Sequence, residues 1–157
     1  MKRFRFALLF MILLLATVPF HLEMERALVN LTGKSFITYA IYAFFMAFFA
    51  VSALRALSSG RMTDISALTM AGSSVFYLLY HTRFLYHRLH LMQFFLLGYL
   101  LMRGNNRKKS VWPFLLLAGA AFFFEFIQKF IPGRVFDTHD IWLNLLAGLA
   151  GFIAALV

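Results

Sequence analysis

Six runs of apolar residues divide the chain, and short polar segments separate them. Each run is long enough to cross the hydrocarbon core of a bilayer as a helix, or nearly so with its flanks, since a span takes about 17 to 25 residues. No strand-like alternation of apolar and polar residues appears. The pattern predicts an all-α membrane protein, a bundle of about six transmembrane helices, over Phe4–Phe20, Phe36–Leu57, Ile65–Tyr80, Leu89–Met102, Val111–Ile131 and Ile141–Val157.

Two of these runs leave an alternative open. The first has a basic start and an apolar middle, as a signal peptide does, but no A-x-A cleavage site follows it, so we expect it to remain as a span. The third is interrupted by Gly72, Ser73 and Ser74 and is the weakest candidate for a span.

The distribution of basic residues favours six spans. With the N-terminus in the cytoplasm, nine of the 15 lysines and arginines lie inside and six lie outside. The densest cluster, Asn105–Lys109, is then inside, as the positive-inside rule prefers. If the third run did not span, this cluster would lie outside. We therefore expect a single transmembrane domain, residues 1–157, with both termini cytoplasmic.

Composition agrees with a membrane location. The chain is 62% hydrophobic and 13% charged, which is about half the charged fraction of a soluble domain. A net charge of +9 in a soluble protein would suggest nucleic acid. Here the basic residues lie between apolar runs, where topology and anionic headgroups account for them, so the expected partner is membrane lipid and not nucleic acid. The absence of cysteine excludes disulfides and thiolate metal sites.

Polar side chains gather where the fifth run ends. Glu125 and Gln128 are three residues apart and share one helix face. Glu125 lies about 9 Å before Ile131 at roughly 1.5 Å per residue, within the hydrocarbon region, where a lone carboxylate costs on the order of 3 kcal/mol. It must be paired, protonated or open to water. The candidate cations are Arg88 and Arg134.

The last run begins with a second polar group. Asp137 or Thr138 could cap its helix, and Asp140 would lie near the positive end of the helix dipole. Asp140 and Asn144 are four residues apart, again on one face. Small residues over 147–151 would let another helix approach closely. We therefore expect Asn144 to face protein.

These residues carry a resemblance to a known family. The pattern E-x-x-Q, then P-G-R-x-x-D-x-x-D-x-x-x-N and a glycine-rich helix, resembles the VanZ-like family of small integral membrane proteins. The matching residues are Glu125, Gln128, Pro132, Gly133, Arg134, Asp137, Asp140, Asn144, Gly148 and Gly151, with Arg88 and His90 upstream. The resemblance covers about residues 83–157. It implies a multi-pass protein of the bacterial inner membrane with a connection to the cell envelope, since the family is named for a protein of teicoplanin resistance.

Three functions are compatible with this constellation. The first is binding of an anionic envelope lipid or lipid-linked cell-wall precursor, with possible relevance to glycopeptide resistance, because guanidinium groups fit phosphate. Its expected ligand-binding residues are Arg88, His90, Glu125, Gln128, Arg134, Asp137, Asp140 and Asn144.

The second function is an enzyme acting on such a lipid, with Glu125 or Asp140 as general base and His90 or His139 assisting. Whether there is catalysis stays open. The third is an accessory subunit of a larger membrane protein complex. His90, Glu125, His139 and Asp140 could ligate a metal only if their spans converge, and no compact metal motif is present, so we expect no metal and no cofactor.

Overall fold

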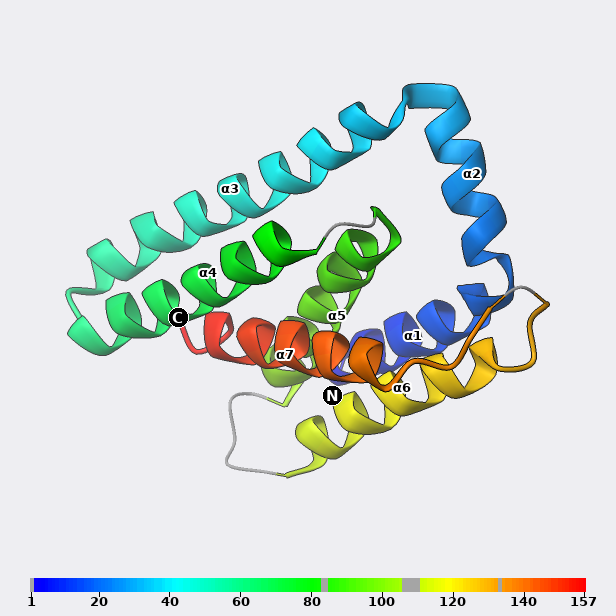
Figure 1. Ribbon diagram of the computed structural model, residues 1–157. Coiled ribbons are helices and arrows are strands. Elements are labelled where there is room, and N and C mark those ends of the chain that lie inside the picture. Colours follow the sequence, from blue (N-terminus) through cyan, green and yellow to red (C-terminus); the bar gives the residue numbers. More distant parts are fainter. Residues whose placement is uncertain (1, 83–84, 106–110, 133) are drawn as a thin grey trace.

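The apolar runs of the chain form helices in a computed structural model (Figure 1). The structure describes residues 2–82, 85–105, 111–132 and 134–157, without the side chains of residues 2, 3, 21 and 22. Within these ranges there is no strand, which confirms the all-α prediction. The elements are α1 (Lys2–Thr17), η1 (Val18–Phe20), α2 (His21–Thr32), α3 (Lys34–Ser59), α4 (Met62–His81), α5 (Leu85–Gly104), α6 (Trp112–Gln128) and α7 (Thr138–Ala154).

Local sequence sets several of the helix ends. Gly33 and Gly60, which flank α3, have φ angles of +81° and +65°, a region that glycine enters without steric cost. Asp137 caps α7, because its side chain accepts a hydrogen bond from the His139 backbone N–H at 2.8 Å. Helix α6 ends at Gln128, earlier than expected, and tighter turns complete the approach to Pro132. Gln128 is therefore the last residue of α6 and lies next to the loop that leads to α7.

The crossing of α5 and α7 is the most extensive helix contact and forms the centre of the fold (Figure 1). A Cβ atom added to Gly98 would collide with the carbonyl oxygen of Gly148, and one added to Gly151 would collide with that of Phe95. The two backbones therefore touch, as the small residues of α7 predict. This contact fixes the position of α7 against α5 at the crossing.

Helix α2 is the element that the apolar pattern did not predict. It leaves α1 at an angle of 83° and rises outside the bundle to the start of α3 (Figure 1). Its large apolar side chains, Met24, Leu28 and Leu31, are exposed, whereas Glu25 and Val29 are half-buried. It is amphipathic, and the spacing of three and four residues produces the two faces.

Length and apolarity alone identify few membrane spans. Among the described residues, α3 is the one helix that is long and apolar enough to cross a membrane. A second candidate arises if α1 and α2 together make one bent span, and α6 is apolar but shorter. The six-span arrangement therefore stays a prediction.

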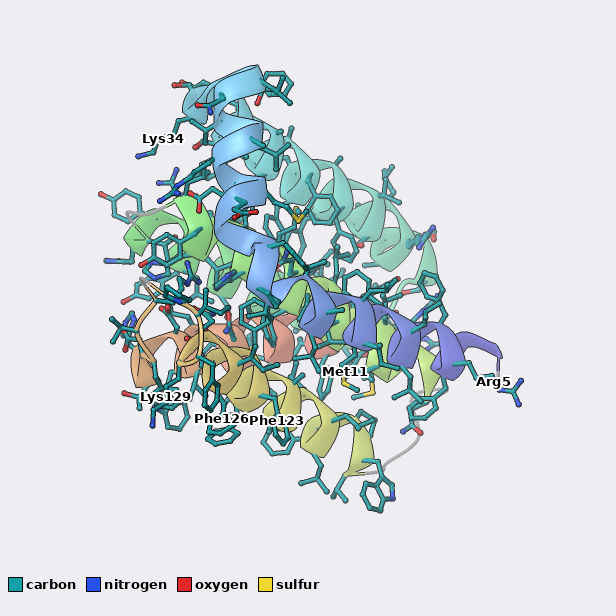
Figure 2. The ribbon with its side chains drawn as sticks, turned by 90° about the vertical axis from the view of Figure 1, so that its right-hand side faces the viewer. Arg5, Met11, Lys34, Phe123, Phe126 and Lys129 are labelled. Carbon is teal, nitrogen blue, oxygen red and sulfur yellow. The ribbon has the colours of Figure 1, made fainter. Side chains whose placement is uncertain are left out.

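The charges occupy opposite ends of the molecule. In Figure 2, Arg5 lies at one end, and Lys34 and Lys129 lie toward the other. The predicted topology assigns Arg5 to the inner side and Lys34 and Lys129 to the outer side, and this assignment stays a prediction. Arg83, the cluster Asn106–Lys109 and Gly133 lie outside the described residues, as do the side chains of Lys2, Arg3 and His21.

Candidate functional site

A relay of hydrogen bonds runs from the loop before α7 into the interior. Arg134 Nε donates to Gln128 Oε1 at 2.9 Å, and Gln128 Nε2 donates to Glu125 Oε1 at 3.0 Å. Glu125 and Gln128 lie on the same face of α6, with 0% and 2% of their surfaces exposed. The predicted need for a partner at Glu125 is thus met by an amide that links it to a guanidinium.

The relay uses only the Nε nitrogen of the Arg134 guanidinium group. Its guanidinium carbon lies 5.5 Å from the centre of the Tyr86 ring, a cation–π contact that holds the group in place. Its two Nη nitrogens make no hydrogen bond to any residue that the structure describes. They are therefore available to an acceptor that presents two oxygens, such as a carboxylate or a phosphate.

Helix α7 supplies the opposite wall of the site. Asp140 is buried, and its Oδ1 lies 2.9 Å from His87 Nε2 and 3.9 Å from His139 Nδ1. One turn further on, Asn144 is 1% exposed, so its predicted orientation toward protein is confirmed. Its two amide atoms, like Glu125 Oε2, find no hydrogen-bond partner among the described residues. Such buried polar atoms cost about 1–3 kcal/mol each unless they are satisfied.

His90 belongs to the same region, but it packs against rings. It is 2% exposed, and its ring lies 4.7 Å from that of Phe124, edge to face. Phe124 precedes Glu125 in α6, so His90 packs against the helix that carries the Glu125 carboxylate. His90 is thus buried between α5 and α6, and its ring contacts Phe124 and Tyr86.

Arg88 is directed elsewhere. Its Nε donates to the carbonyl of Thr82 at 3.2 Å, its Nη1 donates to Thr38 Oγ1 at 3.4 Å, and its guanidinium lies 5.8 Å from the Tyr42 ring. It is two residues after Tyr86, and two residues turn a helix by about 200°. Arg88 therefore faces α3, away from Arg134, and the structure does not join the two arginines in one anion site.

A pocket of about 350 Å³ opens beside the relay. It is lined by Tyr86, Gln128, Arg134, Val135, Phe136, Asp137 and Asp140. Of the eight residues expected to bind ligand, Gln128, Arg134, Asp137 and Asp140 line this pocket. Glu125 is tied to it through Gln128, and Asn144 lies one turn below Asp140.

Two residues at the site, Tyr86 and Glu25, were not among the expected ligand-binding residues. Tyr86 separates this pocket from a second one of about 380 Å³, which is also lined by Glu25, Arg26 and Lys34. Glu25 of α2 and Tyr86 of α5 line the same second pocket, which places this carboxyl beside the site. Burial raises the pKa of Glu25, and the positive charge of Arg134 opposes that shift. The alternation of charged and apolar residues in 21–32 was the available signal.

The charges around the pocket are mixed. Among the residues that the structure describes, Arg134 is the one lysine or arginine that lines it, whereas Asp137 and Asp140 contribute carboxylates. A suitable ligand therefore carries an anionic group for the guanidinium and hydrogen-bond donors for the carboxylates. Among the described residues, no three His, Asp or Glu side chains are arranged to hold a metal ion.

Comparison with known proteins gives one result. The profile of the VanZ/LLP1 family matches residues 6–157, so the similarity extends well beyond the segment whose motif carries the resemblance. No curated protein and no solved structure matches the chain.

Proposed function

The chain belongs to the VanZ/LLP1 family, and we propose that it is a multi-pass protein of the bacterial inner membrane whose outer-facing pocket binds the anionic head of an envelope lipid or lipid-linked cell-wall precursor. The observation that carries the proposal is the Arg134 guanidinium. It is held by Gln128 and Tyr86, it lines an open pocket, and it keeps both Nη nitrogens available.

The membrane part of the proposal is supported by the exposed apolar surface. Phe122, Phe123, Phe126 and Phe130 of α6 and its following turn are 38% to 71% exposed. Figure 2 shows Phe123 and Phe126 projecting away from the other helices. A surface of this kind is unfavourable in water and favourable against acyl chains. Figure 2 shows Lys34 and Lys129 toward one end of the molecule, the proposed outer end. The pocket belongs to this end, because Gln128 lines it next to Lys129, and Lys34 lines the neighbouring pocket that shares Tyr86.

The chemistry of the pocket suggests the class of head group. A phosphate would take the Nη nitrogens of Arg134 in a forked pair of hydrogen bonds. Hydroxyl, amide or amine groups on the same head would donate to Asp137 and Asp140. Lipid-linked precursors combine a phosphate with sugar or peptide groups, so they meet both requirements. A link to glycopeptide resistance would follow if the ligand were such a precursor.

Binding tests the proposal directly. The full chain in detergent micelles is titrated with a polyprenyl diphosphate and, separately, with a neutral polyprenol, and the complexes are counted by native mass spectrometry. We expect the diphosphate to bind and Arg134→Gln to weaken it about tenfold, since a hydrogen bond between charged groups contributes roughly 1.5–3 kcal/mol. Equal binding of both lipids, or no effect of Arg134→Gln, would refute the proposal.

Lys129→Gln is the matched control. Lys129 is an exposed basic residue just after α6 and does not line the pocket. Its removal lowers the net charge by the same amount, so it should leave the affinity unchanged.

A second candidate function is catalysis on the same lipid. The observation that favours it is the pair of His87 and Asp140, 2.9 Å apart, because a carboxylate that orients an imidazole is a common acid–base arrangement. This differs from the expected use of His90 or His139. Turnover of a bound lipid, lost in His87→Gln while binding persists, would establish the enzyme. Retention of turnover in that variant would exclude this pair as its base.

The third candidate, an accessory subunit, rests on the same phenylalanine surface of α6. If a partner protein covers it, Phe123→Ser should release a co-purifying subunit. If lipid covers it, no protein should be lost.

A further inference from the structure

We propose a second lipid site, in a groove between α3 and α5, which binds an anionic phospholipid of the cytoplasmic leaflet with its phosphate at Arg55 and Ser52. The groove has a volume of about 380 Å³. It does not depend on the pocket at Arg134. Its assignment to the cytoplasmic leaflet rests on the proposed membrane orientation.

One face of α3 forms most of the groove. Phe44, Phe48, Val51, Ser52 and Arg55 line it and recur at intervals of three and four residues. They therefore stand in one row along the helix. Tyr99 of α5 forms the other side, with its ring 5.2 Å from that of Phe48, edge to face. The row is apolar over its first two turns and polar at its end.

Ser52 is the unusual member of this row. It is 8% exposed and makes no hydrogen bond to any residue in the described part of the chain. Other helical serines satisfy their hydroxyls by donating to a backbone carbonyl one turn earlier, at 2.7 to 2.9 Å, namely Ser58, Ser59, Ser66, Ser73 and Ser74. The Ser52 hydroxyl lines the groove instead. Because this hydroxyl opens into the groove and is not bonded to a helix carbonyl, it can form a hydrogen bond with an oxygen of a ligand.

Arg55 stands one turn beyond Ser52, at the end of the row. It is exposed and makes no ion pair with an acid in the described ranges. Arg103 adds a second cation near the same end, because its guanidinium lies 5.9 Å from the Tyr99 ring. Two guanidinium groups and a hydroxyl suit a phosphate.

The length of the row matches one leaflet. Phe44 and Arg55 are eleven residues apart, which corresponds to about 16 Å of helix, and half of a hydrocarbon core is about 15 Å. A chain of methylenes would lie on Phe44, Phe48 and Val51, and the phosphate would reach Ser52 and Arg55. An apolar row with a cationic end complements a phospholipid, whose acyl chain ends in an anionic phosphate. A second protein helix does not need a cation at the end of the row.

The test uses the full chain in nanodiscs of equal parts phosphatidylglycerol and phosphatidylcholine. Lipids retained after mild detergent extraction are counted by native mass spectrometry. The native chain should retain phosphatidylglycerol over phosphatidylcholine. We expect Arg55→Gln to reduce this retention about tenfold and Ser52→Ala about threefold, as one charge-assisted and one neutral hydrogen bond would predict.

Three controls make the result specific. Arg61→Gln removes an equally exposed charge close to the end of α3 but outside the groove, and it should change nothing. Ala47→Trp fills the groove without altering charge and should abolish retention. Circular dichroism confirms that each variant is folded. Equal losses in Arg55→Gln and Arg61→Gln would overturn the proposal, as would full retention in Arg55→Gln.

Other occupants give different outcomes. Inorganic phosphate that competes with the lipid at equal concentration would mean that the site binds free anions. The chain has no cysteine, so Ala47→Cys introduces a single thiol, and efficient disulfide-linked dimers would mean that a second copy fills the groove. Either result refutes a lipid site. Arg134→Gln should leave retention at this groove unchanged, so failure of one site does not imply failure of the other.

Discussion

The central prediction concerns Gln128, which joins a buried carboxylate to a guanidinium. Gln128→Leu keeps the volume of the side chain and removes both of its hydrogen bonds, at 2.9 Å to Arg134 and 3.0 Å to Glu125. Bonds to charged groups contribute about 1.5–3 kcal/mol each in soluble proteins, whereas pairs between membrane helices average only about 0.6 kcal/mol. Gln128 lies at the outer end of α6, beside a pocket, so an intermediate total of about 3 kcal/mol is expected.

The assay is reversible unfolding of the full chain in mixed micelles. Trp112 and Trp142 report the transition by fluorescence. Lys129→Gln, one residue away and exposed, serves as the control and should shift the free energy of unfolding by less than about 0.5 kcal/mol.

A double-mutant cycle on Glu125 and Arg134 tests whether Gln128 couples these two residues or whether their contacts are independent. Glu125→Gln and Arg134→Gln should together cost less than the sum of the single changes, by about 1 kcal/mol. In the Gln128→Leu background the two changes should become additive, because the bridge is gone. If Gln128→Leu costs less than about 0.5 kcal/mol, or the coupling persists without Gln128, the relay does not stabilise the fold.

Three further predictions follow from other contacts. Gly98→Ala should lower the free energy of unfolding by about 1–3 kcal/mol, because its Cβ meets the carbonyl of Gly148. The control Gly119→Ala lies in open space on α6 and should be neutral or slightly stabilising. Equal losses in the two variants would contradict the close crossing of α5 and α7. Asp137→Ala should cost about 1 kcal/mol by removing the cap of α7, and Asp137→Asn should restore most of it in the same assay. Burial raises the pKa of Glu25, so the folded state holds that proton more firmly than the unfolded state does, and stability should decline as the pH rises through the range above the ordinary value of 4.5. Glu25→Gln should flatten this decline in melting temperatures measured across that range, and an unchanged slope would show that another group causes it.

The mixed charge of the pocket limits which ligands it can bind. A simple anion would meet Arg134 but would also approach Asp137 and Asp140, and like charges at close range oppose binding. A head group with donors as well as a phosphate avoids this cost. Binding of free phosphate as tightly as of a polyprenyl diphosphate would therefore argue against the assignment of donors to the two aspartates.

Features that depend on local spacing could be predicted from the amino-acid sequence. The apolar runs gave the helices, the three-residue interval gave Glu125 and Gln128 a common face, and the small residues of 147–151 gave α7 a surface that α5 can touch. The likeness to the VanZ-like family was also readable, because its motif lies in one short segment. The cap at Asp137 follows from the same local rules.

The side of each helix that meets a given neighbour became known from the packed fold. It turned Arg88 toward α3, placed His87 against Asp140, made Gln128 the bridge to Arg134 and brought Glu25 of α2 to the site. The helices are apolar on nearly every face, so hydrophobicity alone does not set the rotation of a helix about its axis, and least of all in the proposed membrane surroundings. Rotation is instead fixed by backbone contacts such as that between Gly98 and Gly148, which join segments far apart in the chain.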